Sequence, residues 1–188
     1  MKLREVVNMK MFTGIRLRAI TSEDAQYTLA WRNSDEINSS IVGQKRFVSP
    51  ETESRWVDMA ISDHEGDKAY RFMIIVDGQS APVGMVYLNR ISRVNRTAVT
   101  GIMIGDLEHR GKGYASQATI LLLDYAFHEL GLHSIRANIL SYNEASLKLY
   151  MSLGFKEEGC QRDAIFKGGR FHDLLMFSIL EHEFYEQV

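Results

Sequence analysis

The chain contains one cysteine and two prolines, and neither sign of charge dominates it. A single thiol, Cys160, cannot form an internal disulfide, which indicates a reduced, cytoplasmic protein. The net charge of −2 excludes a bulk electrostatic attraction to nucleic acid or to an anionic membrane. The longest apolar stretch, around residues 120–123, is far too short to cross a bilayer.

The sequence also lacks a metal-binding pattern and a secretory signal. His182 and Glu183 have no second histidine at zinc-protease spacing, so no metal is expected. Residues 1–12 contain no apolar segment of the kind a signal peptide needs, and we interpret them as an N-terminal extension. The remaining residues, 13–188, are long enough to bury one core and are predicted to form a single domain.

Hydrophobic periodicity and turn residues predict an α+β protein. Strands are expected at 15–20, 70–76, 83–91, 97–104, 135–140, 156–166 and 171–179, and helices at 22–33, from Pro50 onward, at 114–130 and at 143–154. The resulting order is β-α-α-β-β-β-α-β-α-β-β. A doubly wound nucleotide-binding fold would instead alternate strand and helix throughout the chain.

A glycine-rich segment, residues 110–116, lies between an apolar strand and the longest predicted helix. Its glycines let the backbone approach a ligand closely. The N-terminus of the following helix presents unpaired N–H groups and the positive end of a dipole, which suits a phosphate. Arg110 and Lys112 add formal positive charge. The segment is therefore predicted to bind a pyrophosphate, with an ordinary strand-to-helix turn as the alternative.

Three phosphate-loop patterns compete for this segment. The Walker A string is absent, which excludes that class. The dinucleotide fingerprint is a near miss, because Ser116 takes the last place and the next strand carries no acidic residue. The third pattern, R-x-x-G-x-A, is matched by Arg110, Gly113 and Ala115. It resembles the pyrophosphate loop of the GNAT superfamily of acetyl-CoA-dependent N-acetyltransferases.

A second motif, residues 143–155, makes the resemblance more specific. Asn143 is a suitable N-cap and Gly154 a suitable helix end. The string closely resembles the GNAT motif N-x-x-[AS]-x-x-[LV]-Y-x-x-x-G-F, and its spacing from Gly113 is typical of that family. The apolar positions expected to pack on this helix are Ala145, Leu149 and Leu153.

The resemblance implies a GNAT-like fold: a mixed, mostly antiparallel central sheet flanked by helices. It also implies an enzyme that uses acetyl-CoA as co-substrate. Main-chain groups near Met103 and Ile104 would orient the pantetheine arm and polarise the thioester. The residues expected to bind the cofactor are Met103, Ile104, Arg110, Gly111, Lys112, Gly113, Tyr114, Ala115, Ser116, Asn143 and Ser146.

Two proton transfers follow from such a reaction. Tyr150 matches the family's general acid and, with a somewhat lowered pKa, would protonate the leaving thiolate; the alternative is a core aromatic residue. The acceptor amine must lose a proton, yet the strand at 97–104 contains no acidic residue. Glu108 is the nearest candidate base, although a solvated loop carboxylate is the simpler interpretation. A water-relayed base is expected and stays unassigned.

The string Trp31-Arg32-Asn33 resembles one found in relatives that act on amino sugars of sugar nucleotides and in ribosomal-protein N-terminal acetyltransferases. Trp31, Arg32 and His172 are the candidate acceptor-binding residues, in a pocket between the first helices and the closing hairpin. Ordinary packing of Trp31 and a surface position for Arg32 are the alternative.

The predicted function is acetyl transfer to a primary amine of a small molecule, with an amino-sugar nucleotide or a polyamine favoured. Acetylation of the N-terminus of a ribosomal or other protein is the alternative within the class. A non-catalytic acyl-CoA-binding module and a nucleotide-dependent oxidoreductase are alternatives from other classes. A homodimer is compatible with the resemblance, and neither nucleic acid nor a membrane is an expected partner.

Overall fold

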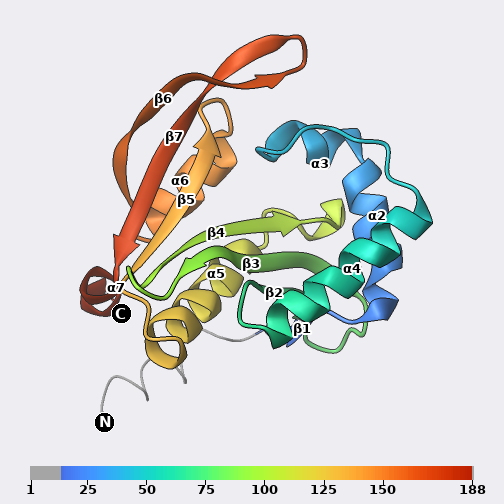
Figure 1. Cartoon of the computed structure of the whole chain (residues 1–188), viewed down its shortest axis with the longest axis horizontal. Coiled ribbons are helices and arrows are strands. Elements are labelled where there is room, and N and C mark those ends of the chain that lie inside the picture. Colours follow the sequence, from blue (N-terminus) through green and yellow to red (C-terminus); the bar gives the residue numbers. More distant parts are fainter. Residues whose placement is uncertain (1–13, 188) are drawn as a thin grey trace.

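The computed structural model describes residues 14–187, so the predicted extension at 1–12 lies outside the described residues. A single seven-stranded sheet runs through the molecule in the order β1-β2-β3-β4-β5-β7-β6 (Figure 1). The strands are β1 (Ile15–Ala19), β2 (Tyr70–Val76), β3 (Pro82–Ser92), β4 (Thr97–Ile104), β5 (Ser134–Leu140), β6 (Lys156–Lys167) and β7 (Arg170–Leu180). Only the central pair β4–β5 is parallel, which confirms the predicted mixed sheet.

Every predicted strand and helix is present. The helices are α2 (Ala25–Asn33), α3 (Asp35–Ser40), α4 (Pro50–Glu65), α5 (Tyr114–Asp124), α6 (Glu144–Ser152) and α7 (Glu181–Gln187), with 3₁₀ turns η1 (Ser22–Asp24) and η2 (Leu107–His109). Helices α3 and α7 were not predicted, because each is too short to produce a periodic signal. Ser34 caps α3 by accepting a hydrogen bond from the Ile37 N–H.

The long helix differs from the prediction at its end. It was expected to continue to Leu130, but α5 stops at Asp124 and a π-helical turn, η3 (Tyr125–Glu129), follows. There the Leu130 N–H bonds to the Tyr125 carbonyl, five residues back. The apolar pattern does not reveal this change, because a π turn inserts one residue without a proline or glycine.

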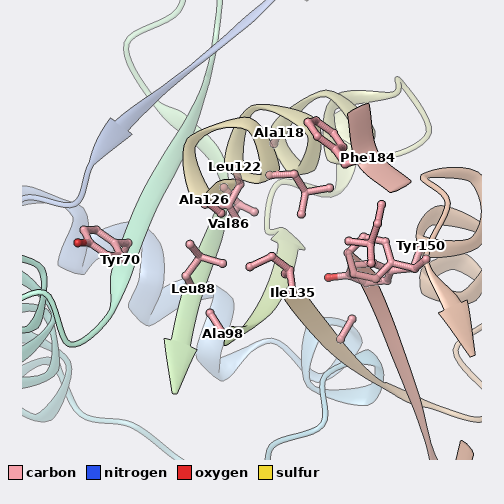
Figure 2. Packing of buried hydrophobic residues seen from close by; sticks show 14 of the residues in the cluster. Tyr70, Val86, Leu88, Ala98, Ala118, Leu122, Ala126, Ile135, Tyr150 and Phe184 are labelled. Carbon is pink, nitrogen blue, oxygen red and sulfur yellow. The ribbon is translucent and has the colours of Figure 1, made fainter. Parts of the chain in front are cut away.

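The sheet is covered on both faces, and each face has its own buried cluster. Met73, Ile75 and Met85 point toward α2 and α4. Their sequence neighbours point the other way, toward α5, and pack with Leu122 and Ala126. Figure 2 shows Ala118 and Leu122 of α5, and Ala126 of η3, turned toward Val86 and Leu88 of β3. This alternation follows from the two-residue period of a strand.

The pairing between β4 and β5 ends before either strand does. Thr97–Thr100 pairs with Ser134–Ala137, whereas β4 continues to Ile104 and β5 to Leu140. Because β4 stays paired with β3 as far as Ile104, the edge of β4 that faces β5 has no strand partner beyond Thr100. The two parallel strands therefore diverge at the centre of the sheet, and their facing backbone groups are left open to a ligand.

Candidate active site

Two hollows meet along the open edge of β4. The outer hollow, about 340 Å³, lies between the end of β4, the segment 110–116 and the start of α6. It is lined by all but one of the residues predicted to bind the cofactor: Met103, Ile104, Arg110, Gly111, Gly113, Tyr114, Ala115, Ser116, Asn143 and Ser146. Lys112 is the exception; it is exposed and is not among the lining residues. Residues of the two motifs, which are distant in the sequence, therefore line the same hollow.

The backbone of the segment 110–116 is shaped by two glycines. Gly111 and Gly113 have φ angles of 73° and 79°, in the left-handed region that glycine adopts without strain. Gly113 is the N-cap of α5, and the first helical amide with a backbone acceptor is that of Gln117, which bonds to Gly113. The three amides before it, at 114–116, have no acceptor within the helix. At the floor of the outer hollow they form a helix end whose free N–H groups could bind an anion.

Arg110 is fixed beside this helix end. Its Nε donates to the Ile104 carbonyl at 3.3 Å, and its Nη1 donates to Glu36 Oε1 of α3 at 2.9 Å. The side chain is 37% exposed, so this ion pair is weak and solvent-screened. Arg110 therefore connects the end of β4 to α3 while leaving donors available at the mouth of the hollow.

The inner hollow, about 350 Å³, lies on the other side of the open edge. It shares six lining residues with the outer hollow: Ser40, Ile41, Ile102, Met103, Asn143 and Ser146. Residues 101–103 of β4 and 138–140 of β5 line it where the two strands diverge. The cleft therefore runs from the N-terminus of α5, past the unpaired edge of β4, to the sheet face under α2 and α4.

Tyr150 lines the inner hollow and is 4% exposed. Its ring packs edge-on against Phe155, with centroids 4.9 Å apart. Burial raises the pKa of the Tyr150 hydroxyl and the nearby Tyr87 raises it further, while a hydrogen bond from Thr100 opposes the shift only in part. The lowered pKa expected from the sequence is therefore wrong in direction. The hydroxyl stays protonated at neutral pH and is available as a hydrogen-bond donor.

The packed face of α6 also differs from the prediction. The buried residue is Tyr150, with Leu147 and Leu153 packed beside it. Ala145 and Leu149, predicted to be in the packed stripe, instead line the outer hollow. The helix begins at Glu144, and the Asn143 side chain accepts a hydrogen bond from the Ser146 N–H. Asn143 is thus the predicted N-cap.

Tyr87 is a cavity residue that the sequence analysis missed. Arg71, Tyr87 and Gly101 form one cross-strand row over β2, β3 and β4. A Cβ atom built on Gly101 would lie 2.1 Å from the Tyr87 hydroxyl oxygen, so this phenol lies directly over β4. The glycine in a strand interior was the available signal, because such a glycine often marks close approach of another group.

The Trp31-Arg32-Asn33 string has three separate structural roles. Trp31 is 6% exposed in the cluster under α2 and α4 and packs against Gly105, where a Cβ would lie 2.2 Å from its ring. It does not line either hollow, contrary to the predicted acceptor contact. Asn33 exchanges two hydrogen bonds of 2.9 Å with the backbone of Val48. Of these three residues, only Arg32 lines the inner hollow.

Arg32 belongs to a cluster around Trp56 of α4. The Arg32 and Arg71 guanidinium carbons lie 4.8 and 5.6 Å from the centroid of the Trp56 ring. Arg32 Nη1 bonds to Glu53 Oε2 at 3.0 Å, and Glu53 is fully buried with its other carboxylate oxygen unpartnered. The three residues of this cluster that line the inner hollow are Arg32, Trp56 and Arg71.

The inner hollow is covered by residues 39–43, which we term the roof segment. Tyr142 Oη donates to the Ser39 carbonyl, and Asn143 Nδ2 donates to the Ser40 carbonyl, both at 2.8 Å. Lys167 Nζ donates to the Ile41 and Gly43 carbonyls at 2.8 and 2.6 Å. Figure 1 shows α3, which leads into this segment, reaching from α2 toward α6 and the β6–β7 hairpin. The roof therefore joins the two halves of the chain across the cleft.

Two other predicted residues lie outside the cleft. His172 packs against Tyr142, with ring centroids 4.6 Å apart, and lines a separate hollow beside the hairpin rather than the inner one. The hairpin contacts the roof segment through Lys167. The hairpin therefore supports the roof of the inner hollow, and His172 does not line the predicted pocket between the first helices and the hairpin. Glu108 is exposed in η2 and lines neither hollow, and nothing in the geometry favours it as a base.

Residues 14–187 contain no group of three or more His, Cys, Asp or Glu side chains arranged to hold a metal ion. No helix in the same range is long and apolar enough to cross a membrane.

A family model described as an acetyltransferase (GNAT) domain matches residues 15–156. The spermidine N(1)-acetyltransferase of Vibrio cholerae is 30% identical over 174 residues, covering 93% of this chain and 97% of that protein. A crystal structure of spermidine N-acetyltransferase from Vibrio cholerae, in complex with CoA and spermine, superposes with a TM-score of 0.82 at 28% identity, over 90% of this chain and 97% of that one.

Two further relatives are similar over different lengths. An uncharacterised N-acetyltransferase, p20 of Bacillus licheniformis, is 40% identical over 117 residues, which span 62% of this chain and 65% of that protein, slightly less than two thirds of its length. The ribosomal-protein-S5-alanine acetyltransferase of Vibrio fischeri has a TM-score of 0.81 at 25% identity, over 90% of this chain and 94% of that one.

Proposed function

This chain belongs to the acetyltransferase (GNAT) family, and we propose that it transfers the acetyl group of acetyl-CoA directly to a primary amine of a small molecule. The observation that carries the proposal is the junction of the two hollows along the unpaired edge of β4. A donor held in the outer hollow and an amine held in the inner one meet there, which suits direct transfer.

The outer hollow would hold acetyl-CoA. The amides at 114–116 and the positive end of the α5 dipole would hold the pyrophosphate, with Arg110 at the mouth. The pantetheine arm would lie along the open edge of β4, where backbone N–H groups near Met103 and Ile104 would hydrogen-bond the thioester oxygen as negative charge develops. The small residues Gly113 and Ser146 would allow acetyl-CoA to approach the backbone closely on either side of the outer hollow.

Tyr150 would assist departure of the thiolate. Tyr150 lines the inner hollow, and its hydroxyl is buried and protonated. Because its pKa is raised above that of a thiol, near 8.5, we assign it a hydrogen bond that stabilises the developing thiolate while Tyr150 keeps its proton, and the thiolate then takes up a proton from water. Thr100, which bonds to the Tyr87 carbonyl at 3.1 Å, would help to orient it.

The amine proton has no assigned recipient. Of the described residues that line the inner hollow, none is Asp, Glu or His. We propose that the amine reacts in its neutral form and that water carries its proton away. Glu108 remains the earlier sequence-based candidate and is not assigned a role.

The acceptor remains to be identified. A polyamine is one candidate, since a relative similar over nearly its whole length is a spermidine acetyltransferase. An amino-sugar nucleotide is another, on the Trp31-Arg32-Asn33 resemblance, and a ribosomal-protein N-terminus is the alternative. The roof segment limits the inner hollow to about 350 Å³, which favours a small molecule. We propose the cytoplasm as the compartment, because the single cysteine has no partner.

The test is release of CoA from acetyl-CoA in the presence of an amine library that includes polyamines, aminated sugar nucleotides and peptides. We expect at least one small amine to be acetylated, and acetyl-CoA to stabilise the protein by about 2.7 kcal/mol at a concentration near 100 times Kd. Stabilisation by acetyl-CoA without any acetylated amine would favour a non-catalytic binding module. Stabilisation by NADH instead would favour the oxidoreductase alternative.

A further inference from the structure

We infer that the inner hollow selects amines that also carry an anionic group, a carboxylate or a phosphate, and that Arg71 and Arg32 beside Trp56 bind that group. This inference rests on the proposed function and specifies its acceptor class. Its basis is the sign of the charges at the wall, which the family relationship does not determine.

Every charged side chain among the described residues that line the inner hollow is cationic. Arg32 and Arg71 are the charged residues among its described lining residues. The carboxylates that balance them, Glu53 and Asp63, lie behind the guanidinium groups and are not part of the lining. A polycation entering the hollow would therefore meet two guanidinium groups and no carboxylate, whereas an anion would be attracted.

The two guanidinium groups are held in place before any ligand arrives. Both lie over the Trp56 indole, and each uses one nitrogen for its carboxylate: Arg32 Nη1 for Glu53 at 3.0 Å and Arg71 Nη1 for Asp63 at 3.3 Å. Their remaining N–H groups have no partner among residues 14–187. Paired, fixed guanidinium donors match the geometry of a carboxylate or phosphate, so little side-chain freedom is lost on binding.

The position of this cluster fits an amine at one end of the acceptor and an anion at the other. Arg71 and Gly101 lie in the same cross-strand row, separated by β3. Two strand spacings make about 10 Å. Consider an acceptor whose amine lies at the open edge of β4. A group on that acceptor that is less than this distance from the amine can lie beside the Arg71 side chain. Asn89, with an unpartnered buried Oδ1, lines the same wall and can accept from a hydroxyl or N–H of the ligand.

The test measures binding of four small amines to the CoA-loaded protein by isothermal titration, so that no turnover is needed. Aminopropylphosphonate and γ-aminobutyrate carry an anion, butylamine is uncharged at its far end, and putrescine carries a second ammonium group. We expect both anionic ligands to bind about tenfold to a hundredfold more tightly than butylamine, and putrescine to bind more weakly still. The stronger of the two anionic ligands identifies the preferred group.

Substitution of the two arginines tests whether they are the source of the preference for anionic ligands. Arg71→Gln is expected to remove about tenfold of the affinity for the anionic ligands while leaving butylamine and CoA binding unchanged. It leaves only the half-exposed Asp63 unpaired, so folding is preserved. Arg32→Lys keeps a cation against the buried Glu53 and should weaken anion binding severalfold by removing the planar donor pair. Arg93→Gln is the matched control, because Arg93 pairs with Asp67 at 3.1 Å on the surface and lines no part of the hollow.

Anionic ligands that bind no more tightly than butylamine, including no binding at all, would overturn the inference. So would preferred binding of putrescine, or an Arg71→Gln variant that weakens all four amines equally. Acetyl-CoA binding in a thermal-shift measurement separates this failure from failure of the proposed function. If acetyl-CoA stabilises the protein and putrescine is preferred, only the anion selectivity is wrong; if acetyl-CoA does not bind, the proposed function is wrong.

Discussion

The floor of the outer hollow is formed by the backbone of one continuous segment, residues 110–116, whereas the inner hollow is formed by side chains from elements scattered along the chain. The floor of the outer hollow needs the amides at 114–116 and two left-handed glycines. The inner hollow takes Arg32 from α2, Trp56 from α4 and Arg71 from β2. A backbone site constrains a short string of residues, so it is visible in the sequence. A side-chain site becomes visible only when the fold has assembled it.

The largest expected effect is at the junction of the two hollows. Tyr150→Phe should lower kcat by roughly a hundredfold or more, the usual contribution of a positioned proton donor, with acetyl-CoA affinity nearly unchanged. Steady-state kinetics and titration with CoA measure the two quantities. Tyr125→Phe removes a hydroxyl from η3, where Tyr125 packs against Tyr70 and lines neither hollow, and serves as the control. An unchanged kcat in Tyr150→Phe would reduce Tyr150 to a packing residue.

A smaller effect is expected in the backbone-built hollow. Gly113→Ala should weaken CoA binding about tenfold, because φ of +79° costs roughly 1–2 kcal/mol for a residue with a Cβ. Gly113→Asp adds a negative charge beside the pyrophosphate and should weaken binding several times further. Gly168→Ala is the control. Gly168 has a φ of +59° in an open hairpin turn, so the substitution imposes similar strain away from the site. Equal CoA affinity for wild type and Gly113→Asp would disprove the site.

In the side-chain-built hollow, substitution of a strand glycine should act through its neighbour. Gly101→Ala brings a Cβ within 2.1 Å of the Tyr87 hydroxyl, so Tyr87 must leave its position. We expect KM for the acceptor to rise about tenfold, within the range of overpacking penalties, with little change for acetyl-CoA. In a Tyr87→Ala background the same substitution should have almost no effect. Additive effects in the double variant would show that the two residues act independently.

The smallest effect is the contribution of Tyr150 ionisation to the pH profile below the ordinary tyrosine pKa. Since the pKa of Tyr150 is raised, its proton is retained as pH increases and would be lost only above the ordinary tyrosine value, near 10. Below that value kcat/KM should rise about tenfold per pH unit as the amine loses its proton, with no alkaline decline. A decline beginning near pH 8 would instead indicate the lowered Tyr150 pKa that the motif alone had suggested.

The sequence predicted what short-range patterns encode. The seven strands, the N-cap Asn143 and the segment 110–116 depend on neighbours along the chain, and all were found where expected. The predicted role of Trp31 failed, because its packing against Gly105 is a contact between distant segments. The pKa of Tyr150 was predicted in the wrong direction for a related reason, since burial is a property of the folded molecule rather than of the motif.

Arg71, Trp56 and Tyr87 could not be recognised as site residues from the sequence. Each is an ordinary residue of its element, and only the register Arg71–Tyr87–Gly101 and the position of α4 bring them together. Gly101 gave a weak signal of close approach, but it did not say which side chain approaches. Motifs therefore predicted the residues that line the outer hollow, and the fold was needed to describe the inner hollow.

The hydrogen bonds that anchor the roof segment have a consequence for folding during synthesis. Lys167 holds the Ile41 carbonyl from 126 positions further along the chain, and Tyr142 holds that of Ser39 across 103 positions. A chain emerging from the ribosome exposes its amino-terminal part first. Its pocket thus lacks a ceiling until nearly the last strand has been translated, so a nascent or carboxy-terminally clipped chain has no finished chamber in which to modify an amine.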